Sequence, residues 1–184
     1  MAWCGWPASV PAAAGWEVYT LLPYDFAPAV SWGQNNPAMI VTYPQTTGWF
    51  STAIKFPQPT LGGSWVQCAH LTSPYVDPTV DPFFSIAWAS EAGPGQANFH
   101  IHMVCSPNNT PMAGGGPGTQ VTQTTAALND LQVTPEMQVP ATGAGSVWGP
   151  DSVLNVNLYR GALPADSIPG PVNVFAVRMR YKLI

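Results

Sequence analysis

Proline and glycine recur along the whole chain, which has 21 prolines and 17 glycines among 184 residues. Proline lacks a backbone N–H and clashes with the preceding turn of a helix, so a helix seldom continues past it. Pairs and clusters of proline and glycine mark turns. The spacing therefore excludes long helices and predicts short extended segments that end at turns. Residues 124–131 are the best helical candidate, and they fit a turn plus a strand at least as well.

Short apolar or alternating runs lie between these turn residues. We expect strands at Trp16–Leu22, Ala38–Tyr43, Trp49–Phe56, Ser64–Leu71, Phe83–Ser90, Ala97–Cys105, Leu131–Val139, Ser152–Tyr159 and Val172–Leu183. Proline cannot donate to a strand ladder. Pro135 therefore predicts that the seventh run is an edge strand or two separate pieces.

Several predicted strands alternate between apolar and polar residues. Leu154, Val156 and Leu158 share one side, and Asn155 and Asn157 lie on the other. The last strand alternates Val177, Met179, Tyr181 and Leu183 with Arg178, Arg180 and Lys182. Such alternation predicts one buried face for each strand. Eight or nine strands of this kind predict an all-β fold, an antiparallel two-sheet sandwich, for which we favour the jelly-roll type because the immunoglobulin Cys…Trp…Cys spacing is missing.

Residues 1–45 differ from the rest of the chain because they combine frequent proline with four of the eight tryptophans. These tryptophans are Trp3, Trp6, Trp16 and Trp32. Aromatic residues concentrate where surface becomes buried. We therefore expect 1–45 to be an extended arm that docks along its own domain or a neighbour, and 46–184 to be the sandwich domain. A disordered tail is the alternative.

Charged residues make up only 8% of the chain, against roughly a quarter in ordinary soluble domains. The cores of protein–protein interfaces are depleted in charge and enriched in aromatic residues and methionine. The composition therefore indicates a surface that is covered by other chains. A neutral domain that faces glycans is the alternative. The net charge of -4 excludes a generally basic nucleic-acid binder.

Most of the basic residues lie near the C-terminus. Arg178, Arg180 and Lys182 fall on one face of the last predicted strand. This basic strand can dock an acidic patch of a partner, and it can equally protect a sheet edge from unwanted pairing. Both interpretations stay open.

His100 and His102 are the sharpest candidate for chemistry, because alternate residues of a strand project to the same face. Two imidazoles so placed can share a metal, as in an enzyme built on a jelly roll. No acidic residue follows where the His-x-His pair of cupins has one, so we favour structural histidines.

Asp77 and Asp81 each precede a proline. A calcium site is conceivable, but Asp-Pro commonly starts a turn, which we favour. Cys4, Cys68 and Cys105 are too widely spaced for a disulfide framework, and buried thiols are expected. The sequence therefore predicts no catalytic residues, no metal and no cofactor.

The first residues lack the basic region of a signal peptide, and Pro7 and Pro11 interrupt any apolar core. No stretch approaches the roughly 20 apolar residues of a membrane helix. We expect synthesis in a cytoplasm and no membrane partner.

The C-terminal half has a recognisable order of segments. These are Trp65-Val66-Gln67-Cys68, Ser85-Ile86-Ala87-Trp88, the threonine-rich Thr122–Val133, Leu154–Arg160 and the closing run Val174–Tyr181. Over residues 50–184 this order resembles jelly-roll modules in virion proteins of tailed bacteriophages.

The resemblance implies a non-enzymatic capsid decoration (cement) protein, or a tail or fibre component, made in the host cytoplasm and located in the virion. It implies a homotrimer that also contacts a major capsid or other virion protein. A carbohydrate-binding, receptor-binding module of a phage tail or fibre is the alternative.

Overall fold

The computed structural model describes residues 15–28, 38–44, 50–58, 64–107, 118–125, 127–143, 146–161 and 165–184. Within these ranges the regular elements are twelve strands and one 3-10 turn, η1 (Pro23–Asp25). The strands are β1 (Trp16–Leu21), β2 (Ala27–Pro28), β3 (Met39–Pro44), β4 (Phe50–Phe56), β5 (Ser64–Leu71), β6 (Phe83–Ser90), β7 (Gly95–Ser106), β8 (Gly118–Thr125), β9 (Gln132–Val133), β10 (Met137–Gln138), β11 (Val153–Arg160) and β12 (Val172–Lys182). Nothing in these ranges is a helix long and apolar enough to cross a membrane.

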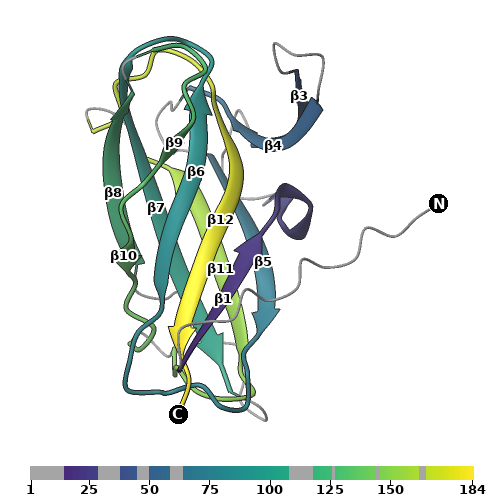
Figure 1. Ribbon diagram of the computed structural model, residues 1–184, viewed down its shortest axis with the longest axis vertical. Coiled ribbons are helices and arrows are strands. Elements are labelled where there is room, and N and C mark those ends of the chain that lie inside the picture. The colour runs from purple at the N-terminus through teal and green to yellow at the C-terminus, as the bar shows by residue number, and fades with distance from the viewer. Residues whose placement is uncertain are drawn as a thin grey trace, which may run out of the picture.

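Strand β12 is the centre of the first sheet, sheet A, which has seven strands. One edge of β12 pairs with β6, and the other edge is shared by β4 near the start of β12 and by β1 near its end. β3 continues the sheet beyond β4, while β9 and β10 share the outer edge of β6. Figure 1 shows β1 along the lower half of β12 and the β3–β4 pair turning away above it.

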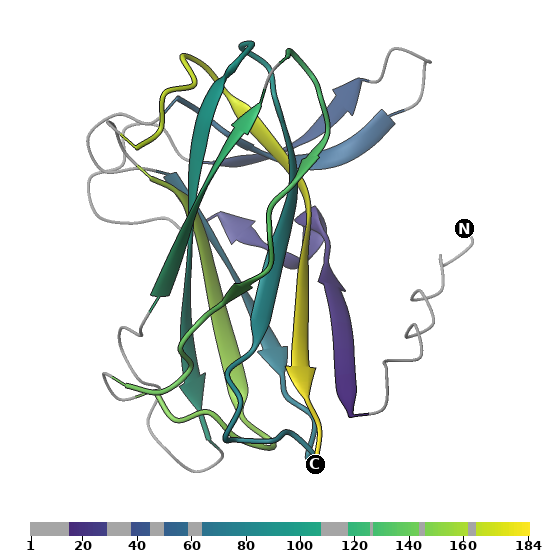
Figure 2. The same cartoon turned by 60° about the vertical axis from the view of Figure 1, so that its left-hand side comes forward.

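The second sheet, sheet B, has five strands in the order β2-β5-β11-β7-β8. Its central strand β11 pairs along its whole length with both β5 and β7, without a register shift. All described pairs of both sheets are antiparallel. Sheet B lies behind sheet A in Figure 1, and the turned view in Figure 2 shows the two layers more nearly side by side.

Apolar side chains from both sheets fill the space between them. Trp88 of β6 and Phe99 of β7 meet edge to face across this space, with ring centroids 5.4 Å apart. Of the alternating residues predicted to face inward, Leu183 is partly buried. The others are fully buried, namely Leu154, Val156, Leu158, Val177, Met179 and Tyr181. The predicted fold class, an all-β antiparallel two-sheet sandwich of jelly-roll type, is confirmed.

Pro135 divides the run 131–139 as expected. The two pieces, β9 and β10, pair separately with β6, through Val133 opposite Ala87 and Met137 opposite Phe84. Between them, the hydroxyl oxygen of Thr134 accepts the Ile86 N–H at 2.9 Å. The two-piece interpretation of this run is therefore confirmed.

The described residues among 124–131, which exclude position 126, are not helical. Thr124 and Thr125 end β8, and the chain then turns at Asn129, whose φ of 62° is left-handed. A left-handed residue cannot continue a right-handed helix. The helical interpretation is wrong, and the one that combines a strand with a turn is right. Most of β8 was missed among the expected strands, because its alternation is carried by threonine and glutamine.

Three strands come from residues 1–45. β1 pairs with β12, β2 with β5, and β3 with β4, so this part of the chain contributes to both sheets. Trp3, Trp6 and Trp32 lie outside the described residues. The division into an arm and a domain at residue 45 stays a prediction.

Candidate functional site

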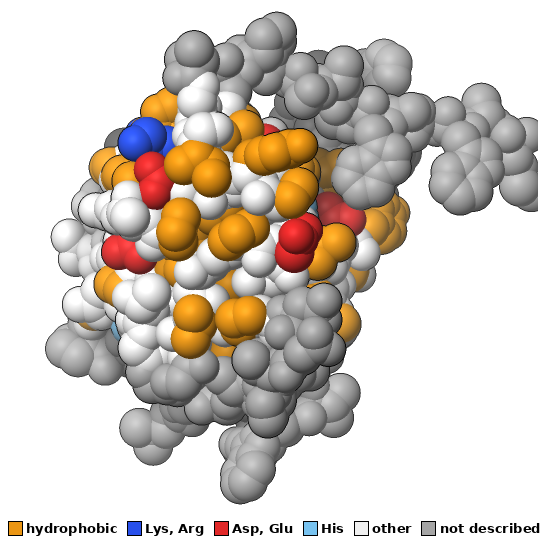
Figure 3. All heavy atoms as spheres, turned by 90° about the horizontal axis from the view of Figure 1, so that it is seen from below, with side chains coloured by type: hydrophobic (Ala, Val, Ile, Leu, Met, Phe, Trp, Pro, Cys, Tyr) orange, Lys and Arg blue, Asp and Glu red, His pale blue; other side chains and the backbone are white. Residues whose placement is uncertain are grey.

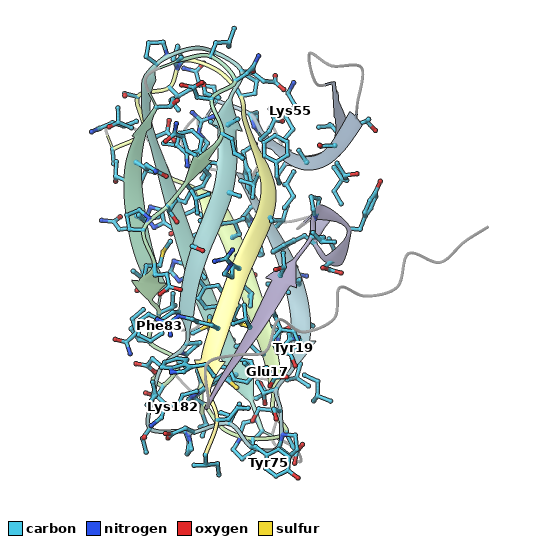
Figure 4. The ribbon with its side chains drawn as sticks, viewed as in Figure 1. Glu17, Tyr19, Lys55, Tyr75, Phe83 and Lys182 are labelled. Carbon is cyan, nitrogen blue, oxygen red and sulfur yellow. The ribbon has the colours of Figure 1, made fainter. Side chains whose placement is uncertain are left out.

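Exposed apolar side chains gather at the end of the sandwich where the chain terminates. We call this surface the apolar end, and it comprises Leu71, Tyr75, Val147, Val153 and Ile184. Leu71 and Val153 are Cα partners at the ends of β5 and β11. Figure 3 views this end of the molecule, and Figure 4 labels Tyr75 there.

Backbone hydrogen bonds hold the apolar end in place. Ile184 donates its N–H to the Tyr75 carbonyl (2.9 Å), and Val147 donates to the carbonyl of Cys105, near the end of β7 (3.0 Å). Tyr75 and Ile184 are nevertheless 64% and 83% exposed. The surface is therefore preformed on paired backbone, and its apolar side chains remain open to water.

The basic strand is divided among three environments. Arg178 is exposed on the outer face of β12. Arg180 donates two hydrogen bonds to the Glu136 carboxylate, at 2.8 and 2.7 Å. Lys182 pairs with Asp77, with 3.0 Å between Nζ and Oδ2. Two of the three predicted interface cations thus already have acidic partners in this chain, and whether the strand docks a partner stays a prediction.

Trp16 and Arg180 are brought together although the sequence placed them in different regions. The Arg180 guanidinium lies 4.3 Å from the Trp16 ring centroid and 4.5 Å from that of Phe83. The hydrogen bonds from Arg180 lower the pKa of Glu136, and the same hydrogen bonds raise the pKa of Arg180. A cation held between two rings gains cation–π attraction as well as the ion pair. This arrangement ties β1, β6 and β12 together.

His100, His102 and Tyr159 form a stack on the outer face of sheet B. Asn98 Nδ2 lies 3.1 Å from His100 Nε2, and the Tyr159 hydroxyl lies 2.9 Å from His100 Nδ1 and 3.0 Å from His102 Nε2. For neutral rings, the Asn98 donor places the His100 proton on Nδ1, and the hydroxyl then donates to His102. Gly161 permits this packing, because a Cβ there would lie 2.6 Å from His100 Nε2.

The stack leaves little for a metal ion to bind. Both ring nitrogens of His100 have partners within the chain. Burial, and then the neighbouring His102, lower the pKa of His100. No group of three or more His, Cys, Asp or Glu in the described ranges is arranged to hold a metal ion. These contacts favour the structural interpretation of the two histidines.

The remaining polar candidates also have structural contacts. Asp77 Oδ1 accepts the N–H of Thr79, two residues on (2.9 Å), which confirms the turn interpretation of Asp77. Asp81 Oδ1 instead accepts the N–H of the distant Ala141 (3.0 Å), so its carboxylate has a structural contact but does not cap a local turn. The Thr79 hydrogen bonds, followed by Lys182, lower the pKa of Asp77 to about 2. Cys68 and Cys105 are free, buried thiols, as expected. Burial raises the pKa of Cys68 to about 12.

A buried ion pair escaped the sequence reasoning. Arg160 and Asp166 are fully buried, and the guanidinium meets the carboxylate at 2.7 and 2.6 Å. Arg160 also donates to the carbonyls of Pro57, Ile168 and Gly170. The sequence could have indicated this pair. Arg160 follows Leu154, Val156 and Leu158 at the same two-residue spacing and so faces inward, and a buried charge needs a counter-charge.

No protein-family model matches this chain, and no curated protein matches it. Among solved structures, it is similar to a family 11 carbohydrate-binding module from Clostridium thermocellum in complex with a mixed-linked tetrasaccharide (TM-score 0.45, 13% identity, 95% of this chain and 94% of that one). It is also similar to the enzymatically active domain of bacteriophage CBA120 tailspike protein 4 (TM-score 0.39, 14% identity, 93% and 20%). A third similar structure is a chain of infectious bursal disease virus, Gx strain (TM-score 0.40, 7% identity, 91% and 33%). At such low identity and TM-score, what those proteins bind says nothing about this chain.

Proposed function

We propose that this chain is a non-enzymatic structural protein of a virus particle that packs its apolar end against other protein subunits. The observation that carries the proposal is the gathering of Leu71, Tyr75, Val147, Val153 and Ile184 on one preformed surface. Contiguous exposed apolar patches mark interaction surfaces. Because charged residues are only 8% of the chain, few charges would have to leave water when the apolar end is buried.

The driving force is burial of apolar area. Each Å² removed from water contributes roughly 25 cal/mol before the costs of association. Because the backbone under the apolar end is already paired, docking requires little further ordering of the chain. The same surface repeated on each copy suits a closed, symmetric assembly.

The specific role that we propose is capsid decoration, or cement. The chain forms a homotrimer in the virion and contacts a major capsid or other virion protein, with Trp3, Trp6, Trp16 and Trp32 of the arm adding to the interface. The order of segments over residues 50–184, which resembles phage virion modules, supports this role. Nucleic acid, membrane and cofactor have no part in it.

Light scattering behind size exclusion tests the proposal on the recombinant full chain. We expect the wild type to elute as a trimer or larger species, and Leu71→Glu to weaken association roughly tenfold or more, because a charge would be buried in the interface. Leu128→Glu is the matched control, since Leu128 is 54% exposed between β8 and β9. A wild type that stays monomeric at all concentrations contradicts the proposal.

A carbohydrate-binding role is the second candidate, and the outer face of sheet B favours it. This face carries uncharged amides and an indole ring, at Trp65, Gln67, Gln120, Asn155 and Asn157. Amides can hydrogen-bond sugar hydroxyls, and an aromatic ring presents an apolar body beside a polar tip. A rise in melting temperature of a monomeric chain with a neutral glycan would favour this candidate over the structural one.

A further inference from the structure

Lys55 and Asn173 lie opposite each other on two neighbouring strands of sheet A. They are Cα partners in the antiparallel pair of β4 and β12. Directly opposed residues project from the same face of a sheet, with Cβ atoms roughly 4.5–5.5 Å apart. Figure 4 labels Lys55 in the upper part of the molecule, where β4 lies beside β12. The pairing therefore puts an amine and a carboxamide within reach of each other.

Glu91 bridges these two side chains. It follows directly after β6, and its N–H donates to the Pro171 carbonyl (3.0 Å), which anchors it beside the start of β12. Its Oε2 accepts from Lys55 Nζ at 2.6 Å, and its Oε1 accepts from Asn173 Nδ2 at 2.8 Å. One carboxylate thus touches the nitrogens of both neighbours.

The carboxamide is fully buried and incompletely satisfied. Asn173 is 0% exposed, and its Oδ1 has no hydrogen-bond partner. An unpaired buried acceptor costs free energy and calls for an explanation. The side chains of Lys55 and Glu91 are also largely removed from water, at 31% and 25% exposed. This is a poor arrangement for simple stability, but it suits a reaction at the Asn173 carbonyl carbon.

We propose that Lys55 and Asn173 form an intramolecular amide bond, with Glu91 as the proton carrier. Lys55 Nζ bonds to Asn173 Cγ, and the bond between Cγ and Nδ2 breaks. Ammonia leaves and is protonated in water, so an ammonium side chain and a carboxamide give a secondary amide and an ammonium ion. Atoms and charge balance, nothing is oxidised or reduced, and no further reactant is required.

Glu91 is placed to carry the protons of this reaction. Its Oε2 first takes a proton from the Lys55 ammonium, which frees the nitrogen lone pair for attack. The resulting carboxylic acid then gives this proton to Nδ2 of Asn173 as that nitrogen departs. The regenerated carboxylate takes the second proton from the Lys55 nitrogen and releases it to water, where it is taken up by the ammonia. One group that acts as base and then as acid is general acid–base catalysis. Strand pairing keeps the reacting groups together, which raises their effective concentration.

The bond would reinforce a short junction of sheet A. β4 and β12 are paired only through residues 54–56 and 172–174, whereas β6 pairs with β12 over a much longer stretch. The β3–β4 pair projects from the sandwich in Figures 1 and 2. A covalent link from Lys55 to Asn173 would fasten this projecting pair to the central strand.

Intact-mass spectrometry of the purified full chain, incubated at neutral pH, is the first test. We expect the wild type to be lighter than its sequence by one ammonia. Glu91→Gln keeps the size of the side chain but cannot carry the protons, so it should show its full sequence mass. Lys55→Arg should do the same.

Digestion of the denatured chain locates the bond. The chain has only two lysines, Lys55 and Lys182. A lysine-specific protease should cut Glu91→Gln after both, and should cut the wild type only after Lys182, because an acylated lysine is not recognised. A wild type that has its full sequence mass overturns the proposal, as does an ammonia loss that leaves cleavage after Lys55 intact.

Discussion

Arg160 shows at the scale of one residue how this chain uses its few charges. All five of its N–H donors have acceptors, two on the Asp166 carboxylate and three on carbonyls of Pro57, Ile168 and Gly170. Asp166 in turn accepts the N–H of Asn98 on β7, at 3.1 Å. The pair therefore fastens the segment before β12 to both sheets.

Replacing Arg160 should be among the most destabilising single changes in the chain. Arg160→Met leaves the Asp166 carboxylate buried without its partner, which costs about 3–5 kcal/mol. Urea unfolding at equal slope measures the loss. Arg178→Met, at the exposed arginine of β12, is the control and should change stability by less than about 0.5 kcal/mol. If Arg160→Met lost as little stability as the control, the Arg160–Asp166 pair would not be important for stability.

At the scale of elements, strand pairing is reinforced by side chains that cross between strands. The His100–Tyr159–His102 stack joins β7 to β11 through two hydrogen bonds to one hydroxyl. In sheet A, the Arg180 guanidinium joins β1, β6 and β12. Both arrangements lie on outer faces, where they add to a core that the inner faces already form.

The stack predicts that stability falls in mild acid. Burial and His102 lower the pKa of His100 below its unfolded value of about 6.5, so the unfolded chain takes up a proton more readily. Stability should therefore be complete above about pH 6.5 and decrease as the pH falls through the folded pKa. Asn98, Tyr159 and His102 contact His100, and Gln120 lies opposite it on β8, so none of these neighbours is a carboxylate that would favour the charged imidazole.

Urea unfolding at neutral pH and in mild acid measures this dependence. His100→Gln should flatten it but not abolish it, because burial also lowers the pKa of His70. An unchanged slope in the variant would assign the acid sensitivity to other groups.

At the scale of the whole molecule, the apolar end lies at one end of the sandwich. How the N-terminal residues contribute to assembly can be tested by deletion. Removing residues 1–45 would delete β1, β2 and β3 and so disturb both sheets. Removing residues 1–14 keeps Gly15, whose carbonyl accepts the Leu183 N–H at 2.7 Å, and all twelve described strands.

Deleting residues 1–14 should therefore weaken the oligomer while the melting temperature of the body changes little. Light scattering and thermal unfolding measure the two effects. The full chain with Trp3→Ala and Trp6→Ala is the matched variant, because it loses only the indole rings. If the oligomer is as stable in both variants as in the wild type, residues 1–14 do not take part in the interface.

Local patterns determined the fold class and the faces of the strands. Alternation placed Leu154, Val156 and Leu158 inside, and Pro135 divided its run, because both effects arise from the geometry of a single strand. β8 was largely missed, because threonine and glutamine give alternation little apolar contrast.

Only the tertiary structure decided which distant residues meet. Glu91 reaches Lys55 across 36 positions of sequence and Asn173 across 82, and Trp16 reaches Arg180 because β1 and β4 divide one edge of β12. The apolar end likewise combines residues from β5, β11 and three further segments. Strand order depends on long-range pairing, which the period of a single strand does not encode. Sequence therefore determined what each strand buries, and the sheets determined which side chains share a site.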